Sequence, residues 1–404
     1  MRHAKLGLLL CLGLLACSGR YERNPSRGTQ AGGSTGPDEQ PDVTQPVATA
    51  GASASAGATS SAGATSSGGA TSGGGGGDVA GSPVQNVDPD PAACGVPIGR
   101  PPAIAAPIAN PMGWWLRLSQ LVWADPAHAP PADLRGAISH EQAGQIADQA
   151  IDQAIAETKG IPGADPFVRD WLRLAEPTAR LVVHWNSALS KGSAVDALLA
   201  LPFDALLGQP LDTMRAGAFS EPAFLQEHPA IAVRGAVMFE SLFGQSLPPE
   251  PPGRPPFTPL PGQTRREALA QAVADPRCSA CHQLMDPLGI SLENYDEYGR
   301  YVSVDAGKPV DASGSYRLLG SGGQVVFKNF ADLSRQLTNN CDATLGLADR
   351  FLVFALEQSG AQRPVLDDSH AIDRERMHQA FIRDGRTYRA LLKAFAQSQA
   401  IRAD

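Results

Sequence analysis

A low-complexity tract most limits what this chain can fold into. From Ala48 to Gly77 every residue is alanine, glycine, serine or threonine. Such a segment has no large side chain to bury against the entropy that is lost on ordering, so residues 18–92 are predicted to be a disordered tether. A packed core therefore has to come from residues 93–404, which suffice for one large core or two lobes.

The charge of the chain excludes one class of partner. The 404 residues include 33 Lys or Arg and 41 Asp or Glu, which gives a formal net charge of -8. Proteins that bind nucleic acids normally present a basic surface to the phosphates. We therefore expect no nucleic-acid partner.

The start of the chain predicts export and lipid attachment. A basic beginning precedes an apolar run from Leu6 to Ala16, which is too short to span a bilayer but suits a secretory signal. The run ends in Leu-Leu-Ala-Cys, which resembles the lipobox of bacterial lipoproteins, so Cys17 is the expected lipidation site. The alternative is a plain signal peptide with a chance cysteine. Ser18 favours the outer membrane, facing the periplasm or the cell surface.

Two further cysteines stand in a motif with its own chemistry. Cys278, Cys281 and the adjacent His282 form the pattern CxxCH. On one helical turn, two cysteines three residues apart can reach two vinyl groups at one edge of a porphyrin, while the next residue presents an imidazole to the iron. The motif therefore predicts one covalent haem c, with Cys278 and Cys281 as thioethers and His282 as the proximal iron ligand.

Three other interpretations of the motif remain open. A thioredoxin-like dithiol would need a preceding strand, whereas Thr264 to Asp275 has the pattern of an amphipathic helix. A structural zinc site would need a fourth ligand such as Cys341. A disulfide between Cys278 and Cys281 would close a very short loop and would leave His282 unexplained.

A carboxylate near the motif has two interpretations. Asp286 lies four residues after His282, so in a continuing helix it would accept a hydrogen bond from the imidazole Nδ1 and tune the iron. The alternative is that the Asp-Pro pair ends the helix, because a residue before proline disfavours helical backbone angles.

The sequence leaves the sixth iron ligand open. Met285 follows His282 by three residues and would lie on the same side of the ring. Three candidates share the segment 367–382, which is predicted to be helical and could fold over the ring: Met377, His378 and His370. Met377 suits a high-potential electron carrier because thioether ligation raises the reduction potential. An open sixth position is the alternative.

The remaining thiols predict a disulfide. Cys11 leaves with the signal and Cys17 takes lipid, so Cys94 and Cys341 are the two thiols left after haem attachment. In an oxidising compartment we expect them to pair and to hold the start of the folded region to the haem lobe. Two buried free thiols are the alternative.

The stretch that follows the motif resembles a known family. The resemblance lies in residues 285–289 (Met-Asp-Pro-Leu-Gly), 292–296 (Leu-Glu-Asn-Tyr-Asp), 299–301 (Gly-Arg-Tyr) and 309–314 (Pro-Val-Asp-Ala-Ser-Gly). These segments look like the planctomycete-type cytochrome c family. The resemblance covers roughly residues 110–400 and is most specific over 278–314. It implies haem and export, but no substrate. Because this chain lacks the second CxxCH of longer relatives, it implies one haem only.

Hydrophobic periodicity predicts a mainly helical fold of two lobes. Ser139 and Gln142 form a capping box before a run with an apolar stripe. The one β signal, from Tyr316 to Lys328, predicts a small hairpin after the haem motif. The predicted parts are residues 1–17 (signal peptide and lipobox), 18–92 (tether), 93–245 (N-terminal helical lobe), 246–262 (proline-rich strap) and 263–404 (haem lobe).

Together these features predict a lipid-anchored electron carrier with a periplasmic or surface redox protein as its partner. A haem enzyme with an open sixth iron position, peroxidase-like or oxidising a small molecule, is the alternative. A third interpretation is a scaffold protein in which the haem only stabilises the fold. No residue stands out as a distal acid or base, so the carrier is favoured and enzymatic activity stays open.

Overall fold

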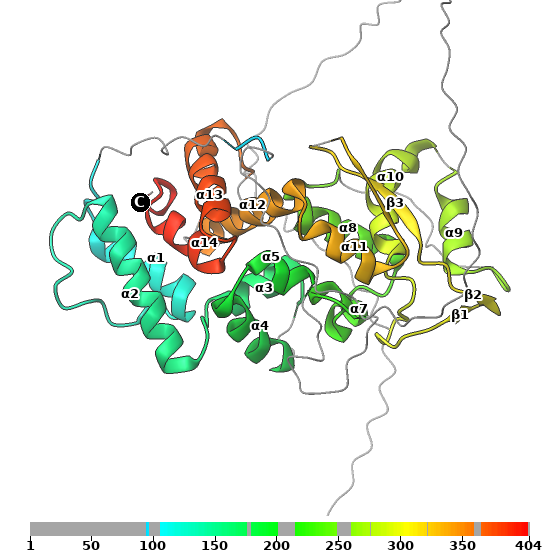
Figure 1. Ribbon diagram of the computed structural model, residues 1–404, viewed down its shortest axis with the longest axis horizontal. Helices are drawn as coiled ribbons and strands as arrows, with labels where there is room; N and C mark the ends of the chain where they lie inside the picture. The colour runs from blue at the N-terminus through cyan, green and yellow to red at the C-terminus, as the bar shows by residue number, and fades with distance from the viewer. Residues whose placement is uncertain are drawn as a thin grey trace, which may run out of the picture. The chain divides into compact units, whose positions relative to one another are not determined.

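Helices make up most of the chain that the structure describes (Figure 1). The computed structural model describes residues 94–96, 106–175, 179–200, 215–248, 260–274, 276–320, 322–358 and 365–402. The predicted signal peptide with Cys17, the predicted tether and residues 249–259 of the predicted strap lie outside these ranges. Within the ranges, every helix is too short or too polar to cross a bilayer.

The helices agree with the predicted mainly helical fold. Those before the strap are α1 (Pro111–Trp123), α2 (His140–Thr158), α3 (Ala164–Leu172), α4 (Ala179–Lys191), α5 (Ala194–Leu199), η1 (Ala218–Ser220), α7 (Pro222–Glu227) and α8 (Ile231–Phe243). Those after it are α9 (Arg265–Ala272), α10 (Pro276–Ile290), α11 (Phe330–Leu337), α12 (Cys341–Gln358), η2 (Asp368–His370), α13 (Ala371–Arg383), α14 (Tyr388–Ala396) and η3 (Ala400–Arg402).

Capping boxes begin two of these helices. At α2 the Ser139 hydroxyl accepts from the backbone of Gln142, and the Gln142 side chain accepts from the Ser139 N–H in return. The same reciprocal pair forms at α9 between Thr264 and Glu267. Each box satisfies two N–H groups that the first turn of a helix leaves unpaired. The predicted start of α2 is therefore confirmed.

Two small antiparallel hairpins follow α10. Strand β3 (Gly314–Arg317) pairs with β4 (Gln324–Phe327), with Gly314 opposite Phe327 and Arg317 opposite Gln324. This is the predicted hairpin, with its first strand placed two residues earlier than the sequence pattern suggested. Strands β1 (Val304–Asp305) and β2 (Lys308–Pro309) form a second pair that the sequence analysis missed. Ala306 and Gly307 turn that hairpin with positive φ angles, and alanine there is a weak turn signal.

One hydrophobic core draws side chains from both predicted lobes. Phe167 on α3 is fully buried, and its ring centroid lies 5.6 Å from that of Phe351 and 5.5 Å from that of Phe354 on α12. Tyr388 on α14 packs on the same ring at 5.6 Å. The indole of Trp114 on α1 donates to the carbonyl of Ala396 at 2.8 Å. The first and last helices thus share one packing unit.

Helix α8 packs closely against α10 and α12, and Figure 1 shows the three helices together. A Cβ at Gly235 on α8 would overlap the carbonyl oxygen of Met285 on α10. A Cβ at Gly289 on α10 would overlap the carbonyl oxygen of Ile231 on α8. The two backbones therefore touch at both glycines, and this contact fixes where α10 lies.

Candidate functional site

The CxxCH motif occupies the first turns of α10. Cys278 and Cys281 are half-buried and both carry free thiols. They are three positions apart in the sequence, so they lie about one helical turn apart on one side of the helix. His282 follows and is 4% exposed. The two cysteines are thus partly exposed, while the imidazole is held inside the protein.

The His282 ring is held by a carboxylate on the next turn. Its Nδ1 lies 2.8 Å from Oδ1 and 2.9 Å from Oδ2 of Asp286. Both side chains are buried, with 5% of the His282 side chain and 10% of the Asp286 side chain exposed. An ionised carboxylate only accepts hydrogen bonds, so beside an ionised Asp286 the Nδ1 of His282 is the donor. The predicted hydrogen bond between Asp286 and His282 is confirmed.

This contact needs α10 to continue through a proline. Pro287 lies inside the helix, which ends only at Ile290. Proline lacks the N–H of a regular helical bond and disfavours helical angles at Asp286 before it. The expectation that the Asp-Pro pair ends the helix is wrong. The backbone contacts of α8 with Met285 and Gly289 flank this turn and hold it against its local preference.

The second ring nitrogen of His282 is the atom that the fold leaves for a ligand. Within the described part of the chain, Nε2 makes no hydrogen bond, although the residue is buried. With its proton on Nδ1, the ring presents a bare lone pair at Nε2. Two free thiols and one such nitrogen on adjacent turns fit a covalently attached haem. Cys278, Cys281 and His282 are the residues that would hold it.

The zinc and disulfide interpretations do not fit this arrangement. Cys341, the fourth zinc ligand that the sequence suggested, is bonded to Cys94 instead. Among the described residues, no cluster of three or more His, Cys, Asp or Glu side chains is arranged to hold a metal ion. Cys278 and Cys281 are not joined to each other. A dithiol of the thioredoxin type is also disfavoured, because helix α9 rather than a strand precedes the motif.

The candidates for a sixth ligand lie on another helix. Met377 is 1% exposed on α13, which packs against α12 and α14, whereas α10 packs against α8 and β3. Figure 1 shows α13 beside α14 and away from α10. His378 is engaged elsewhere, with its Nε2 2.7 Å from Oδ1 of Asp349. The structure therefore does not bring Met377 or His378 to His282.

The two other candidates for the sixth ligand are His370 and Met285. His370 lies near the surface, where its Nδ1 is 3.1 Å from Oδ1 of Asp367. Met285 is 8% exposed on α10 itself, one turn after His282. Because Met285 follows His282 by about one turn on the same side of one helix, it would lie on the same side of the ring as the imidazole.

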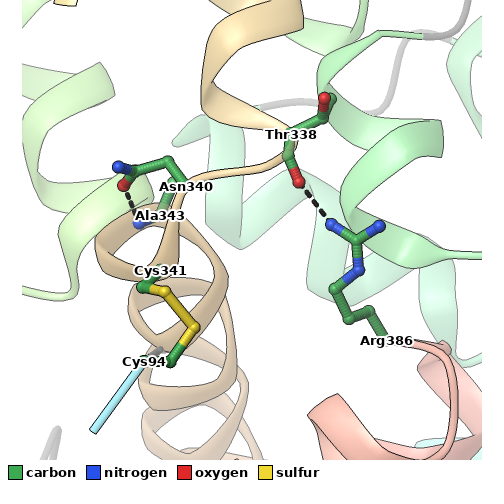
Figure 2. Close-up of a disulfide and its surroundings, with 6 residues drawn as sticks. All are labelled: Cys94, Thr338, Asn340, Cys341, Ala343 and Arg386. Carbon is green, nitrogen blue, oxygen red and sulfur yellow. Dashed lines mark hydrogen bonds between the residues drawn. A yellow bond between two sulfur atoms is a disulfide. The ribbon is translucent and has the colours of Figure 1, made fainter. Parts of the chain in front are cut away.

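The predicted disulfide is present. Cys94 and Cys341 are bonded across 247 residues of sequence. Cys341 begins α12, where the Asn340 side chain accepts from the backbone N–H of Ala343 at 3.1 Å (Figure 2). In the same view Arg386 donates to the carbonyl of Thr338. The bond ties the first described residues to the N-terminal end of α12.

Sequence reasoning missed the role of Arg234 on α8. Its guanidinium is fully buried and donates to the carbonyls of His228, Tyr295 and Asp296, each at 2.8 Å. Burial lowers its pKa to about 10, which leaves it charged at neutral pH. It thereby holds the turn that follows α10. Nothing in the Arg-Gly pair of the sequence predicts that the arginine side chain binds these backbone carbonyls.

Glu293 is a second residue whose burial the sequence analysis missed. It follows α10, is 1% exposed, and accepts from the backbone N–H of Arg266 at 3.2 Å through Oε1. Its Oε2 is buried without a hydrogen-bond partner among the described residues. Burial raises its pKa to about 7, against the opposing charges of Arg265 and Arg266. The raised pKa of Glu293 could not be predicted from the sequence, because its burial depends on how α9 packs over it.

Comparison with known families matches one part of the chain. Residues 215–305 match a family described as "PSCyt3: Protein of unknown function (DUF1588)", which is associated with planctomycete cytochromes c. The matched segment contains α8, the CxxCH motif and the turn held by Arg234. Neither a curated protein nor a solved structure matches the chain. The wider resemblance over residues 110–400 stays a prediction.

Proposed function

We propose that this chain is a lipid-anchored protein with one c-type haem that transfers single electrons outside the cytoplasm. The observation that carries the proposal is the buried His282 on the CxxCH helix, held through Nδ1 by Asp286 with Nε2 left over. Bound haem would supply reversible one-electron chemistry at its iron. The apolar run, Cys17 and the tether support a position at the outer membrane, and a periplasmic or surface redox protein is the proposed partner.

The chain's own residues would do three things at this site. Cys278 and Cys281, which are half-buried free thiols, would form the two thioether bonds. His282 would bind the iron through Nε2. The close contact of α10 with α8 would keep these groups in place during electron transfer, because a rigid site needs little rearrangement when its charge changes.

The attachment test uses the full chain made in a host that assembles c-type cytochromes. We expect the wild type to retain haem stain on a denaturing gel, and a Cys278→Ser/Cys281→Ser variant to lose it completely, because the thioethers are the only covalent links. A Cys94→Ser/Cys341→Ser variant removes two other cysteines and should keep the stain. A colourless wild type would reject the proposal.

A specific observation also supports a haem enzyme as the second candidate. Met377 and His378 lie on α13, which packs against α12 and α14, whereas His282 lies on α10, and this arrangement favours an open sixth position. Absorption spectra separate the two functions. A six-coordinate low-spin iron that does not bind cyanide supports the carrier. A five-coordinate high-spin iron that turns over peroxide supports the enzyme.

A further inference from the structure

The contact between Asp286 and His282 has a consequence for the electronic properties of the site. Many side-chain hydrogen bonds go to backbone carbonyls, which are neutral. Here the acceptor is a carboxylate, and both of its oxygens lie within 2.9 Å of Nδ1. The pair is buried, so solvent screens the charge weakly.

The fold holds this carboxylate in place although the local backbone conformation is unfavourable. Asp286 takes helical angles before Pro287, which the proline ring disfavours. Gly235 and Gly289 allow α8 to touch α10 on either side of that turn. Replacing these small residues would push the helices apart. The packing of α8 against α10 therefore holds Asp286 in this position.

We propose that Asp286 is a positioning residue that keeps His282 in the Nδ1–H tautomer and lowers the reduction potential of the iron bound at Nε2. The inference rests on the proposed function. A carboxylate acceptor makes the imidazole more electron-rich, and an electron-rich ligand stabilises the oxidised, more positive metal. The same negative charge opposes the arrival of an electron. Both effects lower the potential.

The test compares three variants of the holoprotein by spectroelectrochemical titration. Asp286→Asn keeps the shape and an acceptor oxygen but removes the charge, so we expect the equilibrium to shift at least tenfold toward the reduced state, about 59 mV for one electron. Asp286→Glu restores the charge and should return the potential toward that of the wild type. Asp296→Asn is the control, because its carboxylate lies beyond α10 and pairs with Arg300.

Two results would overturn the inference while leaving the proposed function intact. One is a coloured Asp286→Asn protein with the potential of the wild type. The other is an equal shift in Asp296→Asn, which would assign the effect to net charge alone. A colourless wild type would instead reject the proposed function.

A second measurement keeps the inference testable should Asp286→Asn fail to mature. Long-range proton–nitrogen NMR spectra of the full-length Cys278→Ser/Cys281→Ser variant report the His282 tautomer without haem. We expect the proton on Nδ1 and a bare Nε2, and the opposite tautomer would overturn the positioning role.

Discussion

The core around Phe167 and the segment around α10 are stabilised in different ways. Around Phe167 the contacts are aromatic rings from α3, α12 and α14, all fully buried or nearly so. Around α10 the buried groups include Arg234, His282, Asp286 and Glu293, each 7% exposed or less. Apolar burial supplies stability without direction, whereas buried charges have to be paired and oriented. The first region is therefore expected to supply most of the stability, and the second holds buried polar groups in a fixed arrangement.

The largest effect is expected in the aromatic core. Phe167→Ala removes a fully buried ring from contact with three others, and such truncations lower the free energy of unfolding by about 3–5 kcal/mol. Urea unfolding of the full chain measures the change. Phe167→Leu keeps most of the apolar volume and should lose less than half as much. A loss below about 1 kcal/mol for the alanine variant would show that this core is not the main source of stability.

A smaller effect is expected where the helices touch. Gly289→Ala places a methyl group against the carbonyl of Ile231, so α8 and α10 have to separate, and overpacking of this kind lowers the free energy of unfolding by about 1–3 kcal/mol. Unlike Phe167→Ala, it should also disturb the His282–Asp286 hydrogen bond, which the NMR measurement above detects.

A matched glycine tests whether this loss comes from the helix contact. Gly192→Ala adds the same methyl group where nothing lies within 4 Å, so it should leave the stability nearly unchanged. An unchanged stability and His282 spectrum in Gly289→Ala would mean that the contact between α8 and α10 does not hold the site.

Local signals predicted a large share of the fold. The capping residue Ser139 and the pairing of Cys94 with Cys341 depend on short motifs or on counting thiols, and both were found as predicted. The candidate site was predicted in part, because CxxCH is also a local pattern. What the sequence could not reveal depends on distant packing. The continuation of α10 through Pro287 and the carbonyl contacts of Arg234 require α8 to lie against the segment that follows.

The smallest expected effect is a pH dependence from the buried polar segment. The pKa of Glu293 is about 7 in the fold, against 4.5 for an ordinary glutamate. Between these values the folded state binds a proton that the unfolded chain has released. Its contribution to stability is therefore fully present below pH 4.5 and is lost as the pH rises to about 7. Glu293→Gln keeps the shape without the charge, so it should raise the free energy of unfolding at pH 8 by about 1–2 kcal/mol.

The test is urea unfolding of wild type and Glu293→Gln at pH 5 and pH 8. The variant should gain stability relative to the wild type only at the higher pH. Asp311→Asn is the control in the same segment, because the Ser313 hydroxyl lowers the pKa of Asp311 and its titration ends below this range. Its effect should be equal at both pH values. If Glu293→Gln instead acts equally at both pH values, then the carboxyl of Glu293 is already ionised at pH 5, and burial in this segment does not disfavour its charge as the raised pKa implies.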